Sequence, residues 1–346
     1  MDLSIGDATR PRSTRGRLKR LLATALLGRR REALPPAGQL ERRQVPDGRA
    51  DWSDSFYFMG ASAPDAPPVY TFLRLGFRAH LTECWLHLWT EQTGGLDLGF
   101  EEAPASAGLA AGGLSLACET PGQAWRLAYD GPLTDARGRT HAAVLRGRFQ
   151  SSAPLHDFDA GTPPVVIGRA LAGEPWSRDF FTALQAMHQV HYEQLGTLSL
   201  TLTLDGVTSE LRLRSVRDHS YGPRRWDDLR GHCWLTGAMD DGSTWNLTLV
   251  NLPHLRHVLR GYRHDGARSI PVVDGPTLEA LFAHGRPPEA YPLWFRTADG
   301  VRHELEVRRV ADRRFHLGNL EFHEGMADFT CGTARGRGIS EFSFPR

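Results

Sequence analysis

The stretch GTLSLTLTLDGVTSELRLRSV, Gly196–Val216, decides the fold class. Leucines alternate with polar residues in its first half, and two more alternate in its second half. They are Leu198, Leu200, Leu202, Leu204, Leu211 and Leu213. Between the halves lies Asp205-Gly206, a pair that favours a two-residue hairpin turn. The stretch therefore predicts two antiparallel strands that each turn one face toward a core.

The same Asp-Gly pair recurs beside strand-like sequence at Asp130-Gly131, Asp241-Gly242, Asp265-Gly266 and Asp299-Gly300. Repeated hairpins favour antiparallel meanders. A parallel α/β sheet would need long crossover helices, and only short helices are predicted, within 176–190 and 275–285. The sequence therefore predicts an all-β protein, built as two consecutive antiparallel barrels or strongly bent sheets with a few short helices.

A Gly/Pro-rich stretch at 159–176 divides the β region. We expect a first β domain over 51–165 and a second over 177–346. Residues 1–50 differ, because RGRLKRLLATALLGRRR (Arg15–Arg31) predicts a basic helix with leucines at helical spacing, followed by a linker at 33–39. One interpretation is a helix that lies on an anionic membrane or a partner; the other is a helix packed on its own domain, or a loosely ordered arm.

Composition excludes several classes. The 346 residues carry a net charge of +1, so no overall field attracts nucleic acid. Four cysteines stand far apart without a CxxC pair, which argues against a zinc site or a disulfide scaffold. No signal-peptide core or membrane-spanning apolar run is found. We expect a cytoplasmic protein, with peripheral membrane contact through Arg15–Arg31 as an added feature.

The segment SVRDHSYGPRRW, Ser215–Trp226, is dense in polar and aromatic residues and follows the second strand of the hairpin. One interpretation is structural: Arg217 and Asp218 form a charge-assisted hydrogen-bonded corner, with Trp226 packed over it. Spacing alone favours this interpretation, because a buried Arg–Asp corner needs no catalytic role.

The other interpretation of the segment is catalytic. Asp218 and His219 would share a proton as general acid and base. Tyr221, Trp226 and Trp234 would line an apolar cavity and stabilise a cation through their rings.

Metal and cofactor motifs are weak. His188 and His191 stand three residues apart, but a metal site would need a further ligand from elsewhere, which favours ordinary histidines. The sequence has no nucleotide-binding glycine loop, no Walker A motif, no GxSxG and no HExxH. We therefore expect neither a metal nor a cofactor.

Three segments together resemble the lipocalin-like (calycin-related) double-barrel proteins. They are HYEQLGTLSLTLTLDG, VRDHSYGPRRW and DDGSTW. This group includes carotenoid 1,2-hydratase, attachment-type proteins and lipocalin-like Diels–Alderases. The nearest likeness is to a branch with the pattern RDHS[WY]G.R.W. DWSDSFYFMGAS, YTFLRLGFRAH and GTARGRGISEF are similar to that branch's opening and closing strands, so the likeness spans roughly 50–344.

The resemblance implies two lipocalin-like β domains that hold an apolar ligand, and chemistry by acid and aromatic residues without a metal. Carried onto this chain, the predicted catalytic residues are Asp218, His219 and Tyr221. The predicted ligand-binding residues are Arg217, Trp226, His232, Trp234, Trp245 and Glu341.

Three functions follow as hypotheses. The first is a cofactor-free enzyme that hydrates, dehydrates, isomerises or cyclises an isoprenoid- or polyketide-like substrate. The second is a carrier that binds a lipophilic molecule without changing it. The third is an accessory domain of a phosphoenolpyruvate-synthase-like phosphotransferase system, which the resemblance alone suggests.

Overall fold

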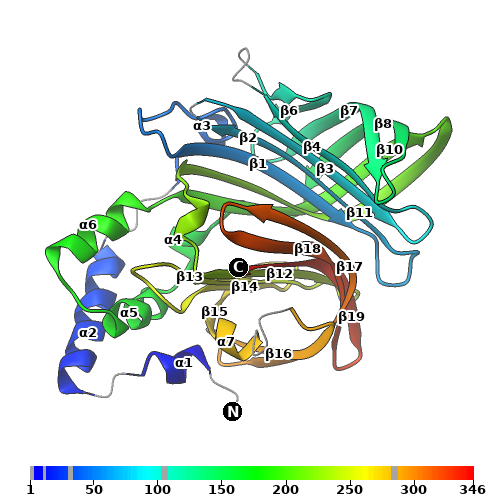
Figure 1. Cartoon of the computed structure of the whole chain (residues 1–346). Coiled ribbons are helices and arrows are strands. Elements are labelled where there is room, and N and C mark those ends of the chain that lie inside the picture. Colours follow the sequence, from blue (N-terminus) through cyan, green and yellow to red (C-terminus); the bar gives the residue numbers. More distant parts are fainter. Residues whose placement is uncertain (1–3, 11–12, 30–33, 79, 103–107, 282–286) are drawn as a thin grey trace. The chain divides into compact units, whose positions relative to one another are not determined.

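The computed structural model describes the chain apart from residues 1–3, 11–12, 30–33, 79, 103–107 and 282–286. Its described residues fold into two β-rich units. The sheet unit consists of the described residues within 34–157 and 188–224, and the barrel unit of those within 1–33, 158–187 and 225–346. The predicted all-β class with two β domains and short helices is confirmed (Figure 1).

Within the described residues, the sheet unit is one eleven-stranded antiparallel sheet, ordered β4-β3-β2-β1-β11-β10-β8-β7-β6-β5 with β9 paired to β10. Leu96 and Asp97 of β4 pair with Asp135 and Thr134 of β7, so the sheet curls back on itself. The strands are β1 (Trp52–Ala61), β2 (Val69–Arg78), β3 (Thr82–Thr90), β4 (Gly94–Glu102), β5 (Ala110–Ala111), β6 (Leu114–Thr120), β7 (Ala124–Asp135), β8 (Thr140–Ser151), β9 (His156–Asp157), β10 (Val190–Leu204) and β11 (Val207–Pro223).

The inside of the curled sheet is the core of this unit. It gathers the inward residues of each strand, among them Phe58, Trp125, Phe149 and the alternating leucines of the β10–β11 hairpin. The short helix α3 (Ala37–Leu40) precedes β1. Alternation along the strands therefore builds the core, as the sequence predicts.

The barrel unit closes eight strands into a barrel in the part of the chain that is described. They are β12 (Gly231–Met239), β13 (Thr244–Asn251), β14 (Val258–His264), β15 (Ser269–Asp274), β16 (Ala290–Thr297), β17 (Arg302–Leu317), β18 (Leu320–Cys331) and β19 (Ala334–Pro345). The helices of this unit are α1 (Ile5–Ala8), α2 (Thr14–Arg29), α4 (Phe158–Gly161), α5 (Pro164–Gly173), α6 (Arg178–Ala186) and α7 (Leu278–Leu281), with a 3₁₀ turn at Trp226–Asp228. The last residues of the helix predicted at 275–285 lie outside the described residues.

Four of the five predicted Asp-Gly turns are confirmed. The β10–β11 hairpin turns at Asp205 and Gly206, whose φ angles of 50° and 84° suit a two-residue turn. Asp241-Gly242, Asp265-Gly266 and Asp299-Gly300 also lie between paired strands. The fifth prediction is wrong: Asp130-Gly131 lies inside β7, in an unbroken ladder with β8.

The unit boundaries differ from the expected ones. The expected bounds place β10 and β11 in the second β domain, but β10 pairs with β8 and β11 pairs with β1. The two strands therefore complete the sheet unit. The Gly/Pro-rich stretch at 159–176, which was expected to divide the β region, is largely helical over α4 and α5. Pro164 opens α5, a position where proline suits a helix.

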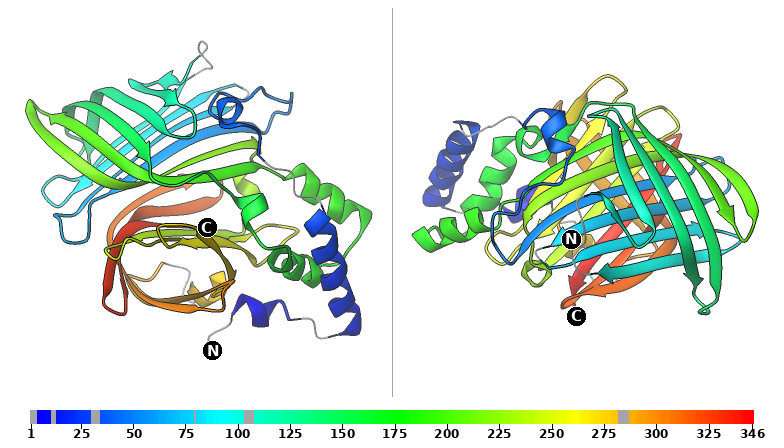
Figure 2. Two further views of the ribbon diagram at one scale, coloured as in Figure 1. Left: turned by 180° about the vertical axis from the view of Figure 1, so that it is seen from behind. Right: turned by 90° about the horizontal axis from the view of Figure 1, so that it is seen from above.

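Helix α2 confirms the predicted N-terminal helix as far as Arg29; Arg30 and Arg31 lie outside the described residues. It packs beside α5 in the barrel unit (Figure 2). Gly168 of α5 permits the close approach, since a Cβ there would come within 2.6 Å of Thr24 Oγ1. None of the helices in the described ranges is long and apolar enough to cross a membrane.

Candidate functional site

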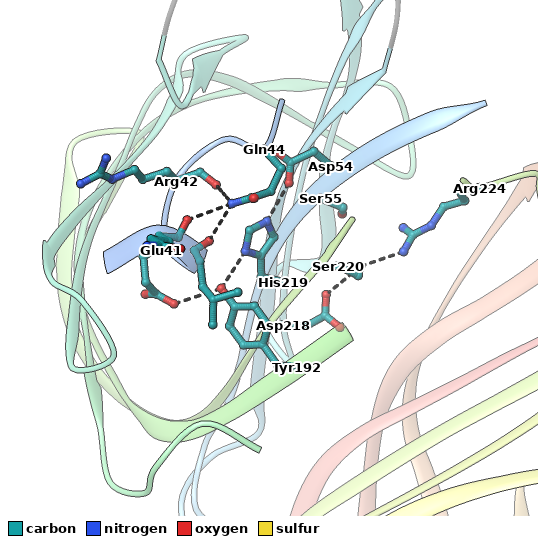
Figure 3. A network of polar contacts seen from close by, with 12 residues as sticks. Glu41, Arg42, Gln44, Asp54, Ser55, Tyr192, Asp218, His219, Ser220 and Arg224 are labelled. Atoms are coloured by element: carbon teal, nitrogen blue, oxygen red, sulfur yellow. Dashed lines mark hydrogen bonds and ion pairs between the residues drawn. The ribbon is translucent and has the colours of Figure 1, made fainter. Parts of the chain in front are cut away.

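The RDHS motif presents its side chains alternately to the two faces of β11. This strand pairs with β10 on one side and β1 on the other. Arg217 and His219 point into the core, whereas Asp218 and Ser220 lie on the outer face. Figure 3 shows the separation: His219 meets Asp54 and a tyrosine, while Asp218 contacts Ser220 on the other side of the strand.

The inner face centres on Glu41, which follows α3 and is 3% exposed. Its carboxylate accepts hydrogen bonds from Arg217 Nη2 at 2.7 Å, Trp125 Nε1 at 2.6 Å and the Tyr192 hydroxyl at 3.1 Å. A buried carboxylate needs such a set, because its charge is otherwise costly to remove from water. Glu41 therefore fixes the segment before β1 to three strands of the sheet.

Arg217 is held as firmly as its partner. Its Nε donates to Gln194 Oε1 at 2.9 Å. Its guanidinium carbon lies 5.7–5.8 Å from the ring centres of Trp125, Phe149 and Tyr192. A planar, always charged guanidinium suits this combination of a carboxylate and aromatic rings.

His219 uses both ring nitrogens inside the same core. Nε2 lies 2.6 Å from Asp54 Oδ1, and Nδ1 lies 2.7 Å from the Tyr192 hydroxyl. The imidazole stacks on Phe56 with ring centres 3.9 Å apart. Asp54 also accepts a 2.8 Å hydrogen bond from the backbone N–H of Gln44. With an exposure of 0%, His219 belongs to a satisfied polar core.

Tyr192 links the two halves of this core. Its hydroxyl has a single proton, so it can donate to Glu41 or to His219 but not to both. Burial raises the pKa of Tyr192, and the Glu41 carboxylate raises it further. The phenol therefore stays neutral at physiological pH.

The outer face of the same strands carries a second histidine–carboxylate pair, formed by His191 and Asp218. His191 Nε2 forms an ion pair with Asp218 Oδ2, and lies 3.9 Å from Glu193 Oε1. The side chains are 27% exposed for His191, 14% for Asp218 and 0% for Glu193. The imidazole is thus within reach of solvent while its carboxylate partners are largely covered.

The charge of Asp218 is supported by its neighbours. Burial by itself would raise the pKa of Asp218, but the ion pair with His191, and the nearby Arg224, outweigh it and lower the pKa. Arg224 Nη2 donates to Ser220 Oγ at 2.7 Å, and Ser220 Oγ donates to Asp218 Oδ1 at 3.4 Å. Burial lowers the pKa of Arg224 to about 10, so its guanidinium remains charged at neutral pH.

His191, Glu193 and Asp218 together also have the donor types of a metal site. One atom each from His191, Glu193 and Asp218 lies within 4.8 Å of the others. Imidazole and carboxylate suit several divalent cations. The positive Arg224 beside Asp218 opposes a second cation there, so the arrangement fits proton transfer better than metal binding.

The rest of the outer face follows from strand register. Asp218 stands opposite Glu193 on β10 and opposite Tyr57 on β1. The Tyr57 ring stacks on Phe72 at 5.7 Å, and its hydroxyl lies 3.5 Å from that of Tyr70. Tyr57, Tyr70 and Phe72, which are 7%, 0% and 0% exposed, therefore form a buried aromatic cluster on the same face of the sheet as the His191–Asp218 pair.

A family model described as a domain of unknown function, DUF7064, matches residues 38–346. The chain belongs to this family. A search of curated proteins with this chain found no match.

Two solved structures share the fold of the DUF7064 chain. An AttH-like protein of Nitrosomonas europaea is 14% identical with a TM-score of 0.54, over 90% of this chain and 100% of that one. Kievitone hydratase of Nectria haematococca is 7% identical with a TM-score of 0.51, over 85% of this chain and 90% of that one. The expected resemblance to lipocalin-like proteins of attachment and hydratase type is therefore supported at the level of fold. The RDHS[WY]G.R.W branch stays a prediction.

The DUF7064 chain does not pair Asp218 with His219 as the sequence suggested. Neighbouring residues of a strand point to opposite faces, so Asp218 contacts His191 and His219 contacts Asp54. Tyr221 lies 5.5 Å from the His219 ring and 6.3 Å from the Trp52 ring, and burial raises its pKa. Arg217 is a core residue.

The remaining predicted residues belong to the barrel unit. His232 Nδ1 lies 3.3 Å from Glu341 Oε1, and Trp234 pairs with Glu341 across β12 and β19. Trp226 packs edge-on against Phe322, with ring centres 5.4 Å apart.

Trp245 does not share a wall with Trp234. It pairs with Gly237 of β12, three residues after Trp234, and therefore faces the other side of the barrel wall. There it lies in the barrel core between Phe329 and Phe295, 4.8 and 5.7 Å away. The predicted aromatic wall is thus not a single surface.

Sequence reasoning missed Glu41, Asp54 and Tyr192. Glu41 stands between the expected linker at 33–39 and the first expected β domain, where no local pattern marks it. The sequence offers His191 only as a candidate metal ligand with His188, and it favours ordinary histidines for both. The signal that could have found it was the hairpin register, which sets His191 opposite Ser220 and beside Asp218.

Proposed function

We propose that this protein binds a hydrophobic, isoprenoid- or polyketide-like small molecule and transfers a proton to or from it, with His191 as the general acid and base. The observation that carries the proposal is the His191–Asp218 ion pair, a partly exposed imidazole oriented by a covered carboxylate. An imidazole held in this way is the usual proton-transfer group of enzymes at neutral pH.

The proposed chemistry needs no cofactor. In the hydration direction, the imidazolium of His191 breaks its N–H bond and a C–H bond forms at the substrate double bond. Water then adds to the resulting cation and returns a proton to the imidazole. Asp218 stabilises the charged imidazole before and after the step. Dehydration is the same sequence in reverse.

The buried aromatic cluster beside the pair supplies the apolar contact. Tyr57 is 7% exposed and is the ring of this cluster that a ligand can contact, because Tyr70 and Phe72 are 0% exposed. An aromatic ring at this place can stabilise a developing cation. One protein with this fold carries the name hydratase. That likeness is an analogy of fold, and the site on this chain carries the argument.

Extraction of the purified full chain, with mass spectrometry of what co-purifies, identifies the ligand class. Turnover of that molecule is then compared between wild type and His191→Gln. We expect His191→Gln to lower turnover by roughly 10²–10⁴-fold, the range that a general acid or base contributes, with binding retained.

A matched control is at hand. His141 Nδ1 contacts Asp205 Oδ2 at 2.7 Å elsewhere on the sheet unit, with the imidazole 21% exposed. His141→Gln should leave turnover unchanged. Unchanged turnover in His191→Gln would refute the catalytic role. A ligand that binds and is never converted would favour the carrier hypothesis instead.

An accessory role beside a phosphotransferase is the remaining hypothesis. Its support is the sequence resemblance alone, and its test is co-purification of such a partner with the full chain.

A further inference from the structure

Helix α2 turns four of its five leucines away from the unit to which it belongs. Leu18, Leu21, Leu22 and Leu26 are 57%, 66%, 48% and 55% exposed, and Ala25 is exposed with them. Their spacing of i, i+3, i+4, i+7 and i+8 places all five on one stripe of the helix. We call this set the leucine stripe.

The opposite side of α2 is the side that packs. Ala23 is buried in a cluster with Ala170, Leu171 and Phe180, and Thr24 lies against α5 at Gly168. Lys19 Nζ donates to the Glu174 carbonyl at 2.9 Å. Ala23, Thr24 and the partly buried Leu27 thus hold the helix in place, and the four leucines of the stripe contribute little to that packing. Figure 2 shows α2 alongside α5 in both views.

Exposed leucines in such a row have a cost in water. Most large apolar side chains of a folded monomer are covered, and a contiguous exposed apolar patch marks an interaction surface. The other exposed large apolar side chains among the described residues are Val45, Phe181, Val207 and Val301, which stand apart in the sequence. The stripe is therefore a feature that calls for an occupant.

The charge of α2 indicates what kind of partner covers the leucine stripe. The first two turns of α2 carry Arg15, Arg17, Lys19 and Arg20, and residues 14–29 contain no Asp or Glu. Arg15 and Arg17 are exposed beside the stripe. A second copy of the chain would bring two such basic helices together, which repulsion opposes. Leucines flanked by arginines complement the apolar interior and negative headgroups of an anionic bilayer.

We propose that the leucine stripe of α2 docks this protein on anionic phospholipid membranes, with the helix lying in the plane of the surface. The stripe supplies apolar contact, and Arg15 and Arg17 supply attraction to the headgroups. This inference is independent of the proposed chemistry, which depends on the sheet unit.

The experiment is co-sedimentation of the full chain with vesicles of phosphatidylcholine alone, or of phosphatidylcholine mixed with phosphatidylglycerol. We expect binding to the mixed vesicles that weakens as salt is raised, and little binding to phosphatidylcholine alone. Leu18→Ser with Leu22→Ser and Leu26→Ser should reduce binding about tenfold or more. Because these leucines are exposed, the thermal transition should hardly change.

Two controls match these variants. Val45→Ser with Val207→Ser and Val301→Ser removes exposed apolar groups elsewhere, and Arg126→Gln with Arg268→Gln removes exposed arginines elsewhere. Both should bind like wild type, whereas Arg15→Gln with Arg17→Gln should bind more weakly and with less dependence on salt. The proposal is overturned if the wild-type protein does not bind anionic vesicles. It is also overturned if the leucine variant binds them as tightly as wild type, or if the only effect of that variant is to convert an oligomer to a monomer.

Discussion

Replacing Arg217 by methionine removes the cation that faces Glu41 while keeping a long apolar side chain in the core. The two groups meet at 2.7 Å and are 1% and 3% exposed. Loss of one partner leaves an unpaired buried charge, which costs about 3–5 kcal/mol. Protonating a carboxyl group at pH 7 costs roughly 4 kcal/mol, which limits the penalty. We therefore expect Arg217→Met to lower the free energy of unfolding by about 3–5 kcal/mol.

Equilibrium unfolding in urea, followed by tryptophan fluorescence and far-UV circular dichroism, measures this loss. Hydrogen exchange of the β10–β11 amides assigns the transition to the sheet unit. Glu41→Gln combined with Arg217→Met removes both charges, so the double variant should be less destabilised than the sum of the singles by about 2 kcal/mol. Arg148→Met is the control, because Arg148 is 53% exposed and meets Glu119 at 2.9 Å; it should cost less than about 1 kcal/mol. If Arg217→Met costs no more free energy of unfolding than this control, the stabilising role given to the Glu41–Arg217 ion pair is wrong.

Two further predictions concern buried titratable groups. Burial, with His191 nearby, lowers the pKa of His156 to about 4; the unfolded chain takes up this proton below about pH 6.5, so the free energy of unfolding should fall from pH 6.5 toward pH 4, by at most about 3 kcal/mol from this group. Urea midpoints across that range should fall less steeply in His156→Gln, and identical slopes would contradict the assignment. Burial raises the pKa of Cys84 to about 12 and that of Cys233 well above its usual value, so neither thiol should react with a thiol reagent until the chain unfolds; peptide mapping after labelling checks this, and rapid labelling of the native chain would count against it.

Local chemistry is what made the strands predictable. Asp205-Gly206 needs only its own backbone preferences and the leucines on either side to form a hairpin. Asp130-Gly131 carries the same letters, yet it lies within β7, because pairing with β8 continues through it. Turn preference is a local quantity, and an extended ladder can override it.

The assignment of strands to units could not be predicted, because local sequence preferences do not say which distant strands pair. Nothing in the β10–β11 sequence says that β11 pairs with β1, which lies far earlier in the chain. Without that pairing, Glu41 and Asp54 could not be placed beside Arg217 and His219. The RDHS motif is dense in polar and charged side chains, but these divide between two faces of the sheet, which only the register across β1, β10 and β11 shows.

Helix α2 illustrates a different limit. The sequence predicts its position and its row of leucines, but a helical row of leucines usually faces a core. Here Ala23, Thr24 and Leu27 make the contact instead of the stripe. Only the partner helix, with Gly168 at the crossing, decides which side is covered.

The interleaving of the two units has a consequence for how the chain is made. β1 finds its partner β11 only after the helices α4, α5 and α6 have been synthesised, and the Glu41–Arg217 contact joins residues 176 positions apart. Until then the sheet has an open edge at β1, and Glu41 lacks its cation. Long-range pairing of this kind slows folding and exposes strand edges to aggregation. Nascent chains cut short before residue 217 should therefore depend on chaperones. The sheet unit can complete its pairing only after the RDHS segment has emerged from the ribosome.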